Sequence, residues 1–291
     1  MAAVLFAGLS AVLFGLMSVA VRIGLRRGTP AEVGSLVSAT TALVVTVVVA
    51  AVSVAAGGEL GAGDLWPFLL AGVLAPGLSQ LFFFQAVRDA GASRTSVIVG
   101  VAPLVAVVIA LVALDEPAEP ALLVAAVVIV AGSIVLGLEP ERPVGFKRAG
   151  VLFALLTTVL FATRDDLLRW LVTDTGRVPP PLPAAAVAMA GGAATLAVFL
   201  VSRRRVSVAA LRAGAMPFVV PGLLFGASYA FLFEAYYHGR VTVVSPLVAT
   251  ESLFGVLFAY LLLRRSELVG RHVVVGAVLI VLGAVVIGAT R

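Results

Sequence analysis

Long apolar runs separated by short polar breaks dominate this sequence. A helix that crosses a bilayer needs about 20 mostly apolar residues, and about ten runs approach or exceed that length. Apolar and polar positions do not alternate as they would in a membrane barrel, so the pattern predicts helices. The expected helices are Ala2–Ile23, Val33–Ala56, Trp66–Val87, Thr95–Leu114, Ala121–Leu138, Ala149–Val172, Leu182–Val201, Met216–Tyr237, Val241–Leu263 and Val273–Ala289.

The composition supports an all-α polytopic membrane protein. Of the 291 residues, 62% are hydrophobic and only 12% are charged, whereas soluble domains are close to half apolar. The basic residues are scattered over short connections, so we expect a lipid bilayer and no nucleic acid as partner. With no cysteine and only two histidines, neither a disulfide nor a metal site is expected, and no other cofactor is predicted.

The second half of the sequence repeats the first. A block that begins with Leu5 and Phe6 recurs from Leu152 and Phe153, and in the same register Arg22 matches Arg169. We therefore predict a five-helix unit over 1–138, a linker over 139–148 and a second five-helix unit over 149–291. An odd number of helices per unit makes the second unit enter the membrane from the opposite side. Such inverted-topology repeats are typical of secondary transporters, whose site lies near mid-membrane between the repeats.

Lys and Arg are distributed unevenly between the two expected sides. One side has only three, whereas the other, which follows each odd-numbered helix, has Arg26, Arg27, Arg88, Arg94, Arg142, Lys147, Arg148, Arg203, Arg204, Arg205, Arg212, Arg264, Arg265 and Arg271. The positive-inside rule places this second set in the cytoplasm. Both termini of this multi-pass protein of the cell membrane are then expected outside.

Glu251 lies near the middle of the apolar run Val241–Leu263. An ionised group at that depth costs roughly 2.5 to 3.5 kcal/mol on insertion scales, so it needs a partner or a function. One hypothesis is that Glu251 binds a coupling proton or a substrate cation. The other is a structural ion pair with Arg164 or Arg169.

The sixth expected helix holds Arg164, Asp165, Asp166 and Arg169 within six positions. Asp165 and Arg169 are four residues apart and can pair along one face. The cluster is either a substrate- or proton-binding group or a self-neutralising set whose arginines reach the headgroups. Asp165, Glu234 and Glu251 are all expected toward the side of the termini, which predicts an acidic vestibule ending at Glu251.

Other polar residues and prolines extend the candidate site. Tyr229, Gln80 and Gln85 are expected to form an amphipathic wall for an organic substrate, although Tyr is also common at membrane boundaries. Pro103 and Pro246 are expected to interrupt helical hydrogen bonding and support rocking motions. With Arg22 and Arg169, we assign them a structural or gating role.

The chain resembles the EamA family of the drug/metabolite transporter superfamily over nearly its full length. The resemblance rests on a stretch from Glu234 through Pro246 and Glu251 to Glu267, and on Gln85–Pro103 with Glu116 in the first half. Phe14, Gly15 and Arg22 look like the motif that ends the family's first helix, with Phe in place of Trp. Ala102 stands where the family often has Glu. The resemblance implies ten helices in two inverted halves and movement of small organic solutes, often outward. Members of this family commonly have cytoplasmic termini, which conflicts with the charge count.

These observations favour a secondary active transporter that exports an amino acid, amine or nucleoside by alternating access. The carboxylates suit a substrate amine and a coupling proton equally well. The alternative is a scaffold or assembly subunit that transports nothing. A channel would need a ring of carbonyls or charges, which is not apparent. Arg164-Asp165-Asp166 has no phosphate loop, metal-ligand set or nucleophile and base beside it, so no enzyme activity is expected.

Overall fold

The computed structural model describes residues 1–58, 65–90, 95, 98–136, 147–174, 179–202, 208–263 and 271–290. Every regular element among them is helical, which confirms the all-α prediction. The elements are α1 (Ala2–Arg26), α2 (Ala31–Ala55), α3 (Trp66–Gly72), the π-helical η1 (Val73–Leu78), α4 (Ser79–Ala90), α6 (Ala102–Ala113), α7 (Pro120–Leu136), α8 (Arg148–Asp174), α9 (Pro181–Ser202), α10 (Val208–His238), α11 (Val241–Val248), α12 (Glu251–Leu263) and α13 (Arg271–Ala289). Most of the expected linker, and Glu267, lie outside the described residues.

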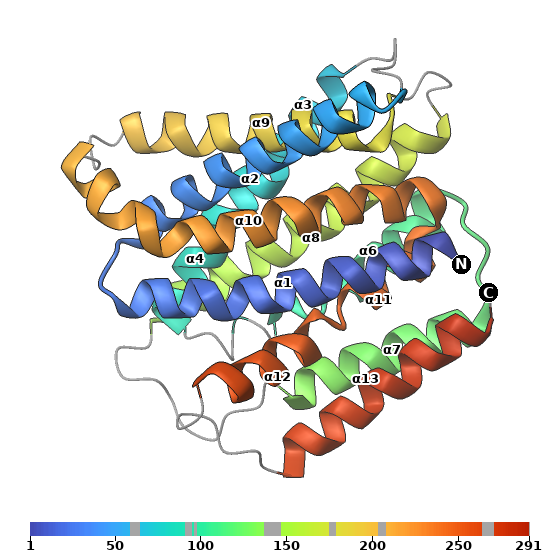
Figure 1. The fold of residues 1–291 in the computed structure, drawn as a ribbon. Coiled ribbons are helices and arrows are strands. Elements are labelled where there is room, and N and C mark those ends of the chain that lie inside the picture. The colour runs from blue at the N-terminus through green and yellow to red at the C-terminus, as the bar shows by residue number, and fades with distance from the viewer. Residues whose placement is uncertain are drawn as a thin grey trace.

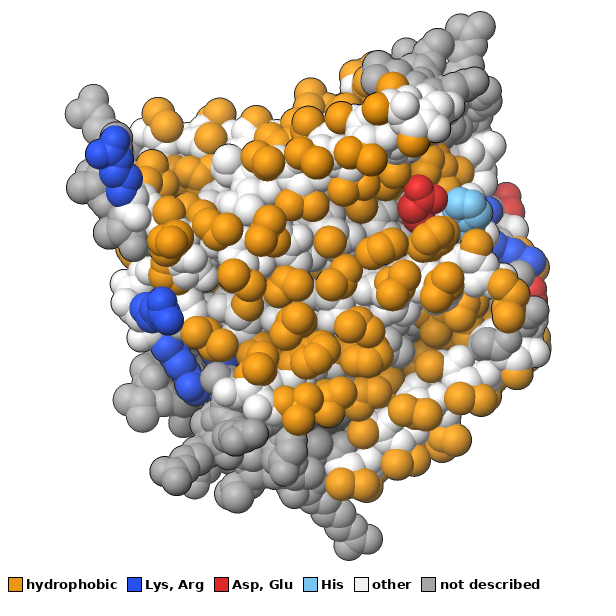
Figure 2. Space-filling model, viewed as in Figure 1, with side chains coloured by type: hydrophobic (Ala, Val, Ile, Leu, Met, Phe, Trp, Pro, Cys, Tyr) orange, Lys and Arg blue, Asp and Glu red, His pale blue; other side chains and the backbone are white. Residues whose placement is uncertain are grey.

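The helices lie side by side in a bundle with both termini at the same end (Figure 1). Five described helices are long and apolar enough to cross a membrane: Ala2–Arg26, Ala31–Ala55, Trp66–Ala90, Pro181–Ser202 and Ala215–His238. Shorter apolar helices cover Ala102–Ala113, Pro120–Val135, Val241–Gly255 and Val274–Ile287. The visible face is almost wholly hydrophobic, and its Lys and Arg side chains gather mainly at the edge away from the termini (Figure 2). This is the surface expected of a multi-pass membrane protein.

Each half of the chain packs mainly against the other half. Helix α1 packs on α10, α11 and α12, whereas α8 packs on α4 and α6. Helix α7 lies along α13, and α2 contacts both α9 and α10. Small residues such as Ala7, Ala11 and Ala162 are fully buried in these contacts, as close helix packing in a bilayer requires. The two halves therefore share one interior.

The third expected helix is interrupted near its middle. Ala75, with φ −147° and ψ 119°, is extended inside η1 and precedes Pro76. The extended residue breaks the pattern of helical hydrogen bonds. The Tyr229 hydroxyl of α10 donates a 2.7 Å hydrogen bond to the carbonyl of Ala75. A side chain of the second half thus satisfies a carbonyl at the break in the first.

The fourth and ninth expected helices are broken as well. A turn at Ala249 and Thr250 separates α11 from α12, and a turn at Gly100 and Val101 precedes α6. In the fourth expected helix the break falls just before Pro103, where the proline is expected to interrupt the helix. Pro103 lies in the first turn of α6, where its missing N–H leaves no helical bond unmade. Pro246 lies inside α11, as expected.

Candidate functional site

Glu251 is the first residue of α12, directly after the break that follows α11. It is half-buried. Its backbone lies against α1 at Gly15, where an added Cβ would come within 2.7 Å of the Glu251 carbonyl oxygen and 2.8 Å of the Gly255 nitrogen. Gly15 therefore allows the approach of α1 to the start of α12, and this approach positions Glu251. The carboxylate thus lies at the start of a helix whose first N–H groups donate to the carbonyls of Ala249 and Thr250 in the preceding turn.

Arg164 and Asp165 of α8 form a buried ion pair, with 2.7 Å between Nε and Oδ1. The expected pairing of Asp165 with Arg169 is replaced by this neighbouring pair. The guanidinium of Arg164 lies over the rings of Phe161 and Tyr229, 5.5 and 5.6 Å from their centroids. Ser245 of α11 donates a 3.3 Å hydrogen bond to Asp165 Oδ2. The pair is thereby held between α8, α10 and α11.

The expected structural ion pair of Glu251 does not form. Within the described part of the chain, neither Arg164 nor Arg169 lies within 4.0 Å of its carboxylate. Arg164 is nevertheless close enough for its charge to act on Glu251. Arg164 already has Asp165 as its partner, and Glu251 begins a separate helix. Among the described residues, the Glu251 carboxylate therefore has no ion pair with an arginine of α8.

Asp166 is 5% exposed, and neither of its carboxylate oxygens has a hydrogen-bond partner in the described residues. Buried polar atoms without partners are rare in folded proteins. Asp166 and Asp165 both occupy the interior, one beside a guanidinium and the other with no direct partner. Arg164, Asp165 and Asp166 of α8 and Tyr229 of α10 are thus buried in the interior, and together with the half-buried Glu251 we call them the polar centre.

Arg169 lies farther along α8, toward the end of the bundle that holds the termini. Its Nε is 3.9 Å from Glu116 Oε1, and its Nη1 donates to the carbonyl of Tyr236 at 3.3 Å. The two Glu116 oxygens also accept hydrogen bonds from the backbone N–H groups of Val241 and Thr242, at 2.9 and 3.0 Å. Sequence reasoning missed this role of Glu116, because the groups it binds are more than 120 residues away.

The remaining candidate residues contact other groups in the described part of the chain or lie apart from the polar centre. The Gln85 Nε2 donates to Glu32 Oε1 at 2.8 Å, where Arg88 also contacts Glu32. Glu234 lies 3.6 Å from His238, four residues later in α10. Gln80 is buried, and its Oε1 has no hydrogen-bond partner among the described residues. Arg22 lies near the end of α1.

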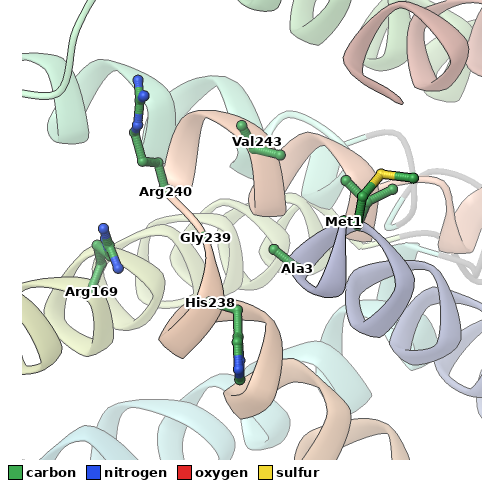
Figure 3. Close-up of a pocket in the computed structure, with 8 residues that line it drawn as sticks. Met1, Ala3, Arg169, His238, Gly239, Arg240 and Val243 are labelled. Atoms are coloured by element: carbon green, nitrogen blue, oxygen red, sulfur yellow. The ribbon is translucent and has the colours of Figure 1, made fainter. Parts of the chain in front are cut away.

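A cavity of about 280 Å³ opens at the end of the bundle that holds the termini (Figure 3). Its charged and titratable lining is basic: Arg169 from α8, His238 from α10 and Arg240 before α11. The start of α1 forms another wall with Met1, Ala3 and Val4. The carboxylates from which the acidic vestibule is predicted, Asp165, Glu234 and Glu251, do not line this cavity. Glu116 accepts from the α11 N–H groups, Glu234 lies beside His238, and Glu251 lies at the polar centre.

Comparison with known proteins identifies the family. The model of the EamA-like transporter family matches residues 1–138 and 148–289. No curated protein matches the chain. Among solved structures, 29 chains match. One of them, described as the crystal structure of a protein, shares 18% sequence identity with this chain. The alignment covers 99% of both chains, and the TM-score is 0.75. At this identity the likeness supports the fold alone.

Proposed function

The chain belongs to the EamA-like transporter family, and from this premise we propose that it is a secondary active transporter of a small organic metabolite. The substrate class is an amino acid, an amine or a nucleoside, and export is the direction. The two halves are inverted-topology units that alternate access to a shared site. The excess of Lys and Arg away from the termini supports a cytoplasmic location for that end.

The polar centre is the observation that carries this proposal. Arg164, Asp165 and Asp166 are each at least 93% buried within a strongly apolar bundle. Charged side chains inside a membrane are costly, and they mark substrate or ion pathways. A scaffold or assembly subunit has no need for such groups. The scaffold alternative is therefore weaker than transport.

The breaks in the helices support a site at this depth. Transporters of the inverted-repeat type place substrate sites where helices are discontinuous, and Glu251 begins α12 at such a break. A cationic group of a substrate would bind Glu251, while the rings of Phe161 and Tyr229 would contact its apolar part. Arg164 would also attract an anionic group of the substrate, which would then share the guanidinium with Asp165. A coupling proton could use the same carboxylates.

Flux measurements in proteoliposomes test the proposal. The purified native protein is compared with protein-free liposomes, using a radiolabelled panel of amino acids, amines and nucleosides in counterflow. At least one class should exchange across the membrane, and a dye for internal pH reports whether protons move with it. A folded, reconstituted protein that exchanges no member of any of the three classes would contradict the proposal.

A further inference from the structure

Two acidic side chains from the turn between α6 and α7, in the first half, reach across to the second half. Glu116 accepts hydrogen bonds from the N–H groups of Val241 and Thr242 and lies near Arg169. Glu119 Oε1 accepts a 2.8 Å hydrogen bond from Arg240 Nη1. We call these contacts of Glu116 and Glu119 with Arg169, Arg240 and the start of α11 the clasp.

Glu116 is the strong member of the clasp. Its side chain is only 6% exposed, and it supplies a carboxylate to the N-terminus of α11, where Arg240 provides no side-chain cap. A carboxylate there satisfies free N–H groups and interacts favourably with the helix dipole. The Glu119 and Arg240 side chains are 40% and 30% exposed, and exposed ion pairs contribute little. Removing the Glu116 carboxylate should therefore weaken the clasp more than removing Glu119 or Arg240.

The clasp lies between the basic cavity and the polar centre. Arg169 and Arg240 line the cavity, and α11 runs from the clasp to the break before Glu251. Ser245, one turn into α11, hydrogen-bonds Asp165 and is 3% exposed. At the opposite end, Arg88 forms ion pairs with Glu32 and Asp89, and Lys147 forms one with Asp89. The Arg88 pairs lie within the first half, whereas the Lys147 pair ties the residue directly before α8 to α4.

From this arrangement we propose that the clasp is the gate that closes the polar centre toward the end that holds the termini. The inference rests on the proposed function, since it names the contacts that alternating access has to break on that side. When the halves rock apart there, Glu116 leaves the start of α11 and Arg169. The cavity then becomes continuous with the polar centre.

Cysteine labelling tests the gate without any substrate. The chain has no cysteine, so Ser245→Cys provides a single reporter beneath the clasp. A water-soluble maleimide is applied to the purified protein in detergent micelles, and the labelling rate is measured. Glu116→Gln removes the charge and one acceptor, and it should raise the rate about ten-fold, because labelling follows the open fraction.

Asp115→Asn is the matched control. Asp115 is an exposed carboxylate in the same turn with φ 48°, a backbone conformation that Asn also tolerates. In the Asp115→Asn background, the labelling rate of the reporter at position 245 should equal the rate in the native background. Thr157→Cys provides a second reporter. Thr157 is fully buried in α8 nearer the other end, so a cysteine at this position should stay protected from the maleimide in every variant. Arg169→Gln provides an independent way to open the clasp if Glu116→Gln does not fold.

The outcomes separate the gate from the transport proposal. Faster labelling at position 245 with protection at position 157 supports the gate, whether or not any solute is transported. Equal rates in the native and Glu116→Gln backgrounds, with both proteins folded, overturn it. Faster labelling at both reporters also overturns it, because the substitution then loosens the whole bundle. Failure of the flux panel alone counts against the transport proposal only.

Discussion

Helices α1 and α8 begin the two halves and share a sequence register, yet they differ sharply in chemistry. With Arg22 matched to Arg169, the positions of Arg164, Asp165 and Asp166 in α8 correspond to Met17, Ser18 and Val19 in α1. Met17 and Val19 are buried, and Ser18 only bonds the carbonyl of Phe14. The same interior position is thus apolar in one half and charged in the other.

The broken helices show the same contrast. Helix α12 begins with Glu251, whereas α6 begins with Ala102. Both follow a turn, so the backbone feature is repeated while the carboxylate is not. The comparison teaches that the two halves share a helix break at this place, whereas only the break in the second half is followed directly by a carboxylate. Substituting residues of one half by their counterparts in the other is the direct way to test this.

The largest effect is expected from Arg164→Met, which gives α8 the α1 residue. It leaves the buried Asp165 without its 2.7 Å partner, and breaking a buried ion pair costs about 3 to 5 kcal/mol. The double variant Arg164→Met/Asp165→Ser, which copies α1 at both positions, should recover most of the lost stability. Denaturation in detergent micelles measures the free energy of unfolding. A double variant as unstable as the single one would contradict the pairing.

Gly15→Ala should have the next largest effect. Its counterpart in α8 is Ala162, but at Gly15 an added Cβ meets the backbone of α12 near Glu251. Forcing atoms into such a contact costs roughly 1 to 3 kcal/mol. Gly8→Ala, on the same helix with no atom within 4 Å of the new Cβ, should leave the free energy of unfolding unchanged or slightly higher. Equal effects at both positions would contradict the close approach.

A smaller effect is expected from Tyr229→Phe, which removes the hydroxyl bonded to the Ala75 carbonyl at 2.7 Å. Losing a buried hydrogen bond of this type costs about 1 kcal/mol. Tyr236→Phe is the matched control, since its buried hydroxyl has no hydrogen-bond partner among the described residues. The control should be neutral or stabilising in the same denaturation experiment. If Tyr236→Phe costs as much as Tyr229→Phe, the hydrogen bond to Ala75 is not the cause.

Much of the fold could be predicted from the sequence, because helix-length apolar runs and a repeated register are local signals. The charged cluster of α8 was also visible, since charges are rare in such runs. The break before Glu251 was not, because Ala249 and Thr250 are ordinary residues in an apolar stretch. The break at Ala75 had a local signal in Pro76, since the residue before a proline is disfavoured in a helix, but the prediction of a continuous helix did not use it. Whether Asp165 pairs with Arg164 or Arg169 depends on packing against α10 and α11. The Glu116 cap depends on contacts between distant segments.

The central claim is that the second half supplies the carboxylate that binds the ligand. The most direct test measures how fast proteoliposomes with the Glu251→Gln variant take up a solute that the native protein transports. The matched variant Ala102→Ser alters the corresponding position of the first half. If the second half supplies the binding carboxylate, Glu251→Gln should lower uptake about a hundred-fold, as expected when a charge that pairs with the ligand is removed. Ala102→Ser should transport normally. Native rates in a folded Glu251→Gln protein would contradict the claim and place the chemistry away from the start of α12.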